Sequence, residues 1–256
     1  MSPVQRDIAH LSEIGVTPSA ALQFVIDEFE TRASKPVTFR LIDEIKSPFR
    51  SGIKEYSDRF VIWIDPSTPT LDYALAHEYG HGITMSDPTF IYIDPRRTAP
   101  EDTQRRETAQ LAASVIEHGA VHALLRKLGF DTAPEALART TSVLSELTPD
   151  LAKTLNRAMN AGDRRARVFA LHNADILTTH RGPLTPMFDA KMRTLFQPAF
   201  VTIVDASVAV INRQAAGELS FVEGATELLR LVGQPELRTF YVSLEAFRAN
   251  LQPWVP

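Results

Sequence analysis

The stretch LDYALAHEYGHGITMSD, residues 71 to 87, decides the fold class, because it combines a helical apolar pattern with two histidines. Within it, His77, Glu78 and His81 form the arrangement HExxH. Residues four apart on a helix share one face, with Cβ atoms roughly 5 to 6 Å apart, so both imidazoles can reach one ion. The pattern therefore predicts a helix that presents two nitrogen ligands to a metal ion, and Zn²⁺ is the metal that this motif indicates.

Glu78 is placed for chemistry rather than for metal binding. Because it follows His77 directly, its carboxylate would lie beside the open position of a zinc ion, where it takes a proton from a bound water. We expect Glu78 to act as general base and then as general acid. A helix with two solvated histidines is the plain alternative, and apolar neighbours such as Leu75 and Ala76 disfavour it.

A catalytic zinc site needs a third protein ligand, and two carboxylates are candidates. Glu107 begins a helical stripe that continues through Leu111 and Val115, so a metal would compensate its expected burial. Asp87 stands where the longer pattern HExxHxxGxxH has its last ligand, although Thr84 replaces the glycine that turns the chain. We expect Glu107 to be the third ligand, with Asp87 as the alternative.

His118 and His122 lie four residues apart further along the same predicted helix. Roughly 16 Å of helix, at 1.5 Å per residue, separates Glu107 from His118, so an unbroken helix cannot bring both to one ion. We expect two partly buried, packed histidines. A second metal site built on them is the alternative.

The composition excludes several classes of protein. The chain has 256 residues, a formal net charge of −4 and no cysteine, so disulfides, thiolate nucleophiles and Cys-based zinc sites are excluded. The balance of charges gives no basic footprint for nucleic acid. We see neither a signal peptide nor an apolar run long enough for a bilayer, and we expect a cytoplasmic protein.

Local patterns predict an α+β unit over residues 1 to 130, followed by an all-helical half over residues 131 to 256. Helices are expected after Thr17 and from Pro100 to Gly129. The alternation in residues 37 to 45 predicts a half-buried strand, and RFVIWID, residues 59 to 65, predicts a second strand. In the second half, FVTIVDASVAVI is typical of a buried helix, and Ser220 with Glu223 of a capping box. The basic run RRAR, residues 164 to 167, is expected to be a solvated face.

DRFVIWIDPSTPTLDYALAHEYGH, residues 58 to 81, resembles the strand, loop and active helix of the ImmA/IrrE family of zinc metallopeptidases. In that family the third ligand is the glutamate of a run similar to E-x-A-N-x-x-A-A. RRETAQLAASVI, residues 105 to 116, supplies Glu107 there, with 25 residues between His81 and Glu107. Gln110 replaces the usual asparagine.

The resemblance covers roughly residues 30 to 120. It implies a gluzincin-type fold, in which a small twisted sheet lies above the active helix and the glutamate helix lies alongside. It also implies that residues 60 to 64 form an edge strand, which we expect to pair with an extended peptide.

We therefore expect a zinc metallopeptidase that acts on a peptide or protein, with the helical half as a wall, a lid or a homo-oligomer surface. Two other classes stay open. One is a regulator that acts on or binds a single protein partner, such as a repressor. The other is a non-catalytic scaffold stabilised by zinc.

Overall fold

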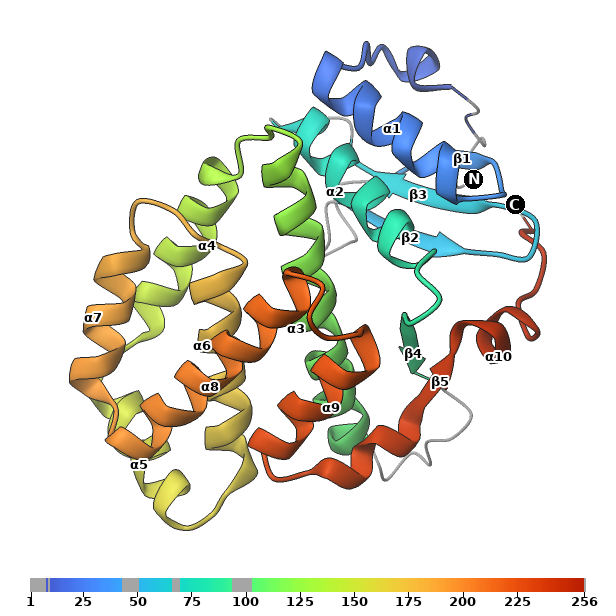
Figure 1. Cartoon of the computed structure of the whole chain (residues 1–256). Coiled ribbons are helices and arrows are strands. Elements are labelled where there is room, and N and C mark those ends of the chain that lie inside the picture. The colour runs from blue at the N-terminus through green and yellow to red at the C-terminus, as the bar shows by residue number, and fades with distance from the viewer. Residues whose placement is uncertain (1–7, 9, 43–50, 66–69, 94–102, 256) are drawn as a thin grey trace, which may run out of the picture. The chain divides into compact units, whose positions relative to one another are not determined.

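The computed structural model describes residues 8, 10–42, 51–65, 70–93 and 103–255 (Figure 1). By its internal contacts the chain divides into two compact units. The first comprises Met1–Pro88, Leu124–Phe130 and Leu244–Pro256, and the second Thr89–Ala123 and Asp131–Ser243. The units thus interleave along the chain, whereas the sequence analysis placed one boundary after residue 130.

The first unit contains a small sheet with two helices on one of its faces. Its three strands have the order β1-β3-β2, with β1 parallel and β2 antiparallel to β3. In Figure 1 both α1 and α2 lie on the same side of this sheet, and they contact each other along their length. The elements are η1 (Leu11–Ile14), α1 (Ala20–Arg32), β1 (Val37–Leu41), β2 (Ser51–Glu55), β3 (Phe60–Ile64), α2 (Leu71–Thr84) and α10 (Leu244–Arg248).

β3 is the central strand, so the expectation that residues 60–64 form an edge strand was wrong. Val37 of β1 pairs with Phe60 on one side, and Ser51 of β2 pairs with Ile64 on the other. The physical reason lies in the strand itself: only Trp63 is more than marginally exposed, and a strand that is apolar on both faces belongs inside a sheet. The edge position belongs to β2, which the sequence analysis did not predict.

The opposite face of the sheet is covered by Trp254, near the C-terminal end of the chain. The guanidinium of Arg40 lies 4.5 Å from the centroid of the Trp254 ring, and the Trp63 ring lies 6.0 Å from it. Arg40 is therefore 8% exposed, although it alternates with the apolar residues of β1. A segment more than two hundred residues away in sequence supplies the cover.

The core between the sheet and its helices is centred on Phe29 of α1. The Phe29 ring is 1% exposed, and its centroid lies 5.2 Å from those of Phe60 and Tyr79. Gly82 permits this packing, because a Cβ atom there would collide with the Phe29 ring and lie 3.2 Å from Ile53 Cδ1. α2 continues past Gly82 to Thr84, so this glycine serves close approach rather than helix termination.

The second unit is helical, with one short two-stranded sheet. The long helix predicted after Pro100, the helix over residues 200 to 211 and the capping box of Ser220 and Glu223 are confirmed. The elements are β4 (Ile91–Ile93), most of α3 (Thr103–Lys127), α4 (Ala133–Glu146), α5 (Pro149–Asn160), α6 (Arg164–Thr178), α7 (Thr185–Leu195), α8 (Pro198–Ala215), α9 (Phe221–Leu231), η4 (Pro235–Phe240) and β5 (Tyr241–Ser243).

The chain is therefore mixed α and β, with a small sheet and a helical C-terminal half, as predicted at that level. The exception is β5, which pairs antiparallel with β4 and places Tyr241 opposite Ile93. Strands of three residues are too short to give a period-two signal, so neither was predicted.

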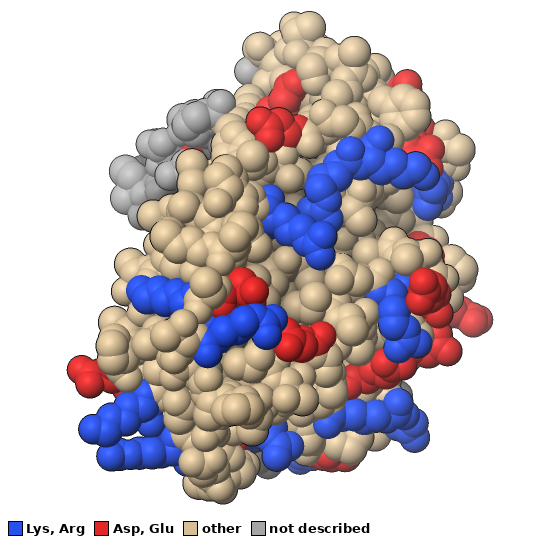
Figure 2. Space-filling model, turned by 60° about the vertical axis from the view of Figure 1, so that its left-hand side comes forward, with Lys and Arg blue, Asp and Glu red and all other residues tan. Residues whose placement is uncertain are grey.

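The surface carries both signs of charge. On the face that Figure 2 shows, basic and acidic side chains are interspersed among uncharged ones, in keeping with the balanced composition. No helix of the described residues is long and apolar enough to cross a membrane.

The contact of Gly82 with Phe29 yields a stability prediction. Gly82→Ala should lower the free energy of unfolding by about 1–2 kcal/mol, because overpacking outweighs the higher helix propensity of alanine. Gly52→Ala is the matched control, since a Cβ atom on Gly52 meets nothing within 4 Å. Urea denaturation of the two variants measures the difference, and equal stabilities would contradict the packing described here.

Candidate metal centre

The two histidines of the HExxH motif lie side by side on α2, as the four-residue spacing predicted. Their Nε2 atoms are 3.0 Å apart, and their ring planes are inclined at 77°. Two nitrogens bound to one zinc at 2.0–2.1 Å with a tetrahedral angle would be about 3.3 Å apart. The imidazole pair is thus close enough to share a metal ion. An N–H···N hydrogen bond, with one imidazole as donor, is the metal-free alternative for this separation.

Glu78 is buried, in contrast to the half-exposed histidines on either side of it. Glu78 is 4% exposed, and its Oε1 accepts a hydrogen bond of 2.7 Å from Ser51 Oγ. Because a desolvated carboxylate needs polar partners, this hydroxyl helps to hold it in place. Ser51 was not predicted as a site residue, since it lies on the unpredicted strand β2, and no local motif connects it to α2.

Asp87 lies just beyond the C-terminal end of α2. Its backbone N–H donates a hydrogen bond of 3.0 Å to the carbonyl of Thr84, and its side chain is half-buried. Among the described residues, no group of three ligand-type side chains joins Asp87 to His77 and His81. The helix would have to end at Gly82 to turn Asp87 back, and it does not, so this placement disfavours Asp87 as the third ligand.

Glu107 is on α3 in the second unit, and it is exposed. The predicted inward stripe is correct for Val115, which is buried, but wrong for Glu107 at its start. The stripe fails there because the face of α3 that carries Gln104 and Glu107 is exposed, whereas the adjacent Thr108 and Ala109 are buried. The assignment of Glu107 as third zinc ligand stays a prediction.

The other histidines of α3 differ in their surroundings. His118 is half-buried, with its Nδ1 3.4 Å from Ser114 Oγ. His122 is 1% exposed, and its ring centroid lies 5.3 Å from that of His180 in an edge-to-face contact. Desolvation lowers the pKa of His180, which favours the neutral ring. The expectation of a packed histidine is confirmed for His122, which belongs to no potential metal-binding group within the described ranges.

Comparisons with protein-family models, with curated proteins and with solved structures find no match for this chain. The resemblance to the ImmA/IrrE family stays a prediction made from the residues that carry it.

The imidazole pair yields a prediction about metal binding. Zn²⁺ at about 100 times its dissociation constant should stabilise the protein by about 2.7 kcal/mol, because a ligand that binds only the folded state shifts the unfolding equilibrium. His77→Ala and His81→Ala should each abolish the rise in melting temperature. His10→Ala, which changes an exposed histidine, should retain it. A zinc-dependent rise in melting temperature that persists in both His77→Ala and His81→Ala would contradict metal binding by this imidazole pair.

Proposed function

We propose that this protein is a zinc-dependent metallopeptidase. The observation that carries the proposal is the arrangement on α2 of two adjacent imidazoles, 3.0 Å apart, with the buried carboxylate of Glu78 between them in sequence. Zn²⁺ held by His77 and His81 would supply Lewis-acid polarisation of a peptide carbonyl. The donor set fits this ion, because neutral imidazole is a common zinc ligand and the chain contains no cysteine.

Glu78 performs the proton transfers in this proposal. Its carboxylate takes a proton from the attacking water and delivers it to the leaving amine as the peptide bond breaks. Ser51 acts as a positioning residue, because its hydroxyl donates to the carboxylate at 2.7 Å and restricts the rotation of the side chain. A purely structural zinc site would not need a buried carboxylate next to its ligands, so Glu78 favours an enzyme over a scaffold.

The third zinc ligand is proposed to come from α3. Glu107 is the candidate that the sequence motif indicates. His118 is the second candidate, because it is a half-buried imidazole on the same helix. α3 is continuous from Thr103 to Lys127, and roughly 16 Å of helix separates the two side chains, so one of them alone can bind the ion.

The substrate is proposed to be an extended peptide segment that pairs with β2 rather than with β3. Within the part of the chain that the structure describes, β2 pairs with β3 alone, and its other side is the edge of the sheet. Backbone hydrogen bonds to such an edge bind a peptide without requiring particular side chains. Ser51 begins β2 and contacts Glu78, so a peptide on this edge would pass the catalytic carboxylate.

The role of Glu78 is tested by a substitution that keeps the shape of the side chain. Glu78→Gln should lower kcat by at least about 100-fold, because the general base is lost, while bound zinc per chain stays unchanged. Glu30→Gln, which changes an exposed glutamate on α1, is the control. Mass spectrometry of a peptide library incubated with each protein measures the hydrolysis. Equal turnover by Glu78→Gln and the unmodified protein would overturn the proposed mechanism, whereas no hydrolysis by either protein would leave a scaffold.

The third ligand is tested by metal content. Zinc per chain should fall strongly in one of Glu107→Ala and His118→Ala and should stay unchanged in the other, because the two residues exclude each other. Asp87→Ala should retain its zinc and serves as the control. Full retention in both α3 variants, measured by elemental analysis after dialysis, would refute a ligand from this helix.

A further inference from the structure

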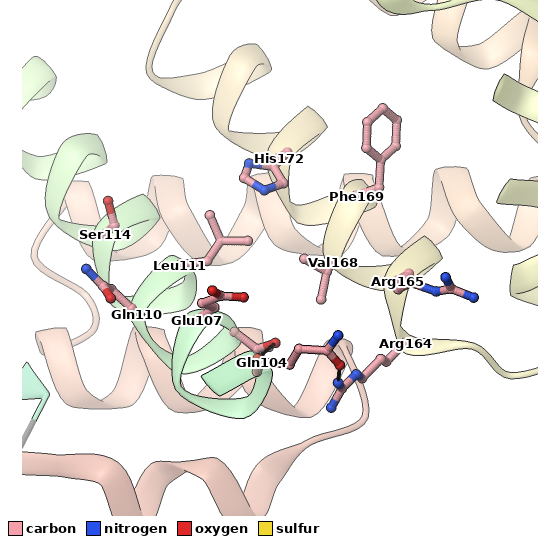
Figure 3. A pocket seen from close by; sticks show the side chains of 11 residues that line it. Gln104, Glu107, Gln110, Leu111, Ser114, Arg164, Arg165, Val168, Phe169 and His172 are labelled. Atoms are coloured by element: carbon pink, nitrogen blue, oxygen red, sulfur yellow. Dashed lines mark hydrogen bonds between the residues drawn. The ribbon is translucent and has the colours of Figure 1, made fainter. Parts of the chain in front are cut away.

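The second unit contains a pocket of about 560 Å³ between α3 and α6. Its volume is in the range of roughly 300–1,000 Å³ that is usual for small-molecule sites. Figure 3 shows Glu107 and Leu111 from α3 opposite Val168 and His172 from α6. The pocket therefore combines an aliphatic wall with a carboxylate.

The Glu107 carboxylate makes no hydrogen bond or ion pair with any described residue. The pocket also contains a cation, Arg164, which is half-buried and donates a hydrogen bond to Gln104 Oε1. No ion pair joins Arg164 to Glu107 among the residues that are described, so the two opposite charges are separated across the pocket.

The neighbouring arginine has a different role. Arg165 also borders the pocket, but its Nη2 lies 2.6 Å from Asp163 Oδ2, and its side chain points away from the others in Figure 3. Arg165 is thus neutralised by its own helix cap, and Arg164 is left as the positive group. The expectation that residues 164 to 167 form only a solvated face is incomplete in this respect.

We propose that this pocket binds a small zwitterion, namely a free aliphatic amino acid. Glu107 binds the ammonium group, Arg164 binds the carboxylate, and Leu111 and Val168 contact the aliphatic side chain. A ligand with a single charge would satisfy one of the two groups and meet repulsion from the other. The separated charge pair therefore selects for a ligand that carries both signs.

His172 supports this selection. The ring is exposed at one edge of the pocket, yet the surrounding atoms desolvate it and lower its pKa, so it is neutral at pH 7. It adds a hydrogen-bonding group without a second positive charge, and the charges of the pocket stay balanced.

The assignment of Glu107 to this pocket has a consequence for the proposed zinc site. If Glu107 binds an ammonium group, the α3 ligand of the zinc is His118. The pocket does not depend on peptidase activity, so it can be tested separately.

The test is calorimetric titration of the full-length His77→Ala protein with L-leucine, N-acetyl-L-leucine and L-leucinamide. The His77→Ala background prevents chelation of zinc by the amino acid. Leucine should bind, and blocking either terminus should weaken binding about tenfold or more, because each blocked form loses one charge-assisted contact. The proposal would be overturned if leucine did not bind at millimolar concentration. It would also be overturned if all three compounds bound with equal affinity.

Substitutions in the pocket assign each charge. Glu107→Gln should weaken leucine binding about tenfold and remove the difference in affinity between leucine and N-acetyl-L-leucine. Arg164→Gln should also weaken leucine binding about tenfold, and it should remove the difference in affinity between leucine and L-leucinamide. Arg165→Gln is the matched control and should bind leucine unchanged, with folding of all variants checked by circular dichroism. Loss of zinc from Glu107→Gln in the otherwise unmodified protein would assign Glu107 to the metal and refute this inference, while the proposed peptidase activity would stand.

Discussion

The separation of 3.0 Å between the Nε2 atoms of His77 and His81 is the feature on which the functional account depends. The helical period alone brings the two imidazoles to one face of α2, but packing decides which way that face turns. Close approach of Gly82 to Phe29 fixes α2 against α1, and the buried ring of Tyr79 packs against Phe39 of the sheet. The same rotation places Glu78 against β2, where Ser51 reaches its carboxylate, and leaves the histidines half-exposed. The packing of α2 against α1 and the sheet thus sets the positions of the candidate ligands and of the candidate base together.

The burial of Glu78 also distinguishes between the two kinds of zinc site that this motif can form, a structural site and a hydrolytic one. Desolvation of a carboxylate costs free energy, and both the hydrogen bond from Ser51 and a bound cation would offset part of that cost. A structural site gains nothing from that arrangement, whereas a hydrolytic site gains a fixed proton acceptor. The Glu107 carboxylate differs from that of Glu78, because it is exposed and lies in a pocket with Arg164. Two glutamates that both looked like parts of one metal centre therefore have different surroundings.

Local patterns in the sequence were sufficient for the helices and for the imidazole pair. α2, α3, α8 and the cap at Ser220 follow from apolar period and capping residues, which depend on neighbours within a few positions. Other features depend on contacts between distant segments. β2 has the sequence SGIKE, which shows no clear alternation, so neither its place at the sheet edge nor the contact of Ser51 with Glu78 could be predicted. Arg40 is buried by Trp254, and β5 pairs with β4 across about 150 residues of chain, so neither the burial nor the pairing leaves a local signal.

Zinc K-edge X-ray absorption of the zinc-loaded protein tests the central claim most directly, because it reports the ligands of the ion themselves. The account predicts four nitrogen or oxygen ligands, with the Zn–N distances of about 2.0–2.1 Å and the outer-shell scattering of imidazole rings. Two imidazoles would indicate Glu107 as the further protein ligand, and three would indicate His118. A first shell of oxygen alone, or a spectrum that is unchanged when His77 and His81 are both replaced by alanine, would contradict the account.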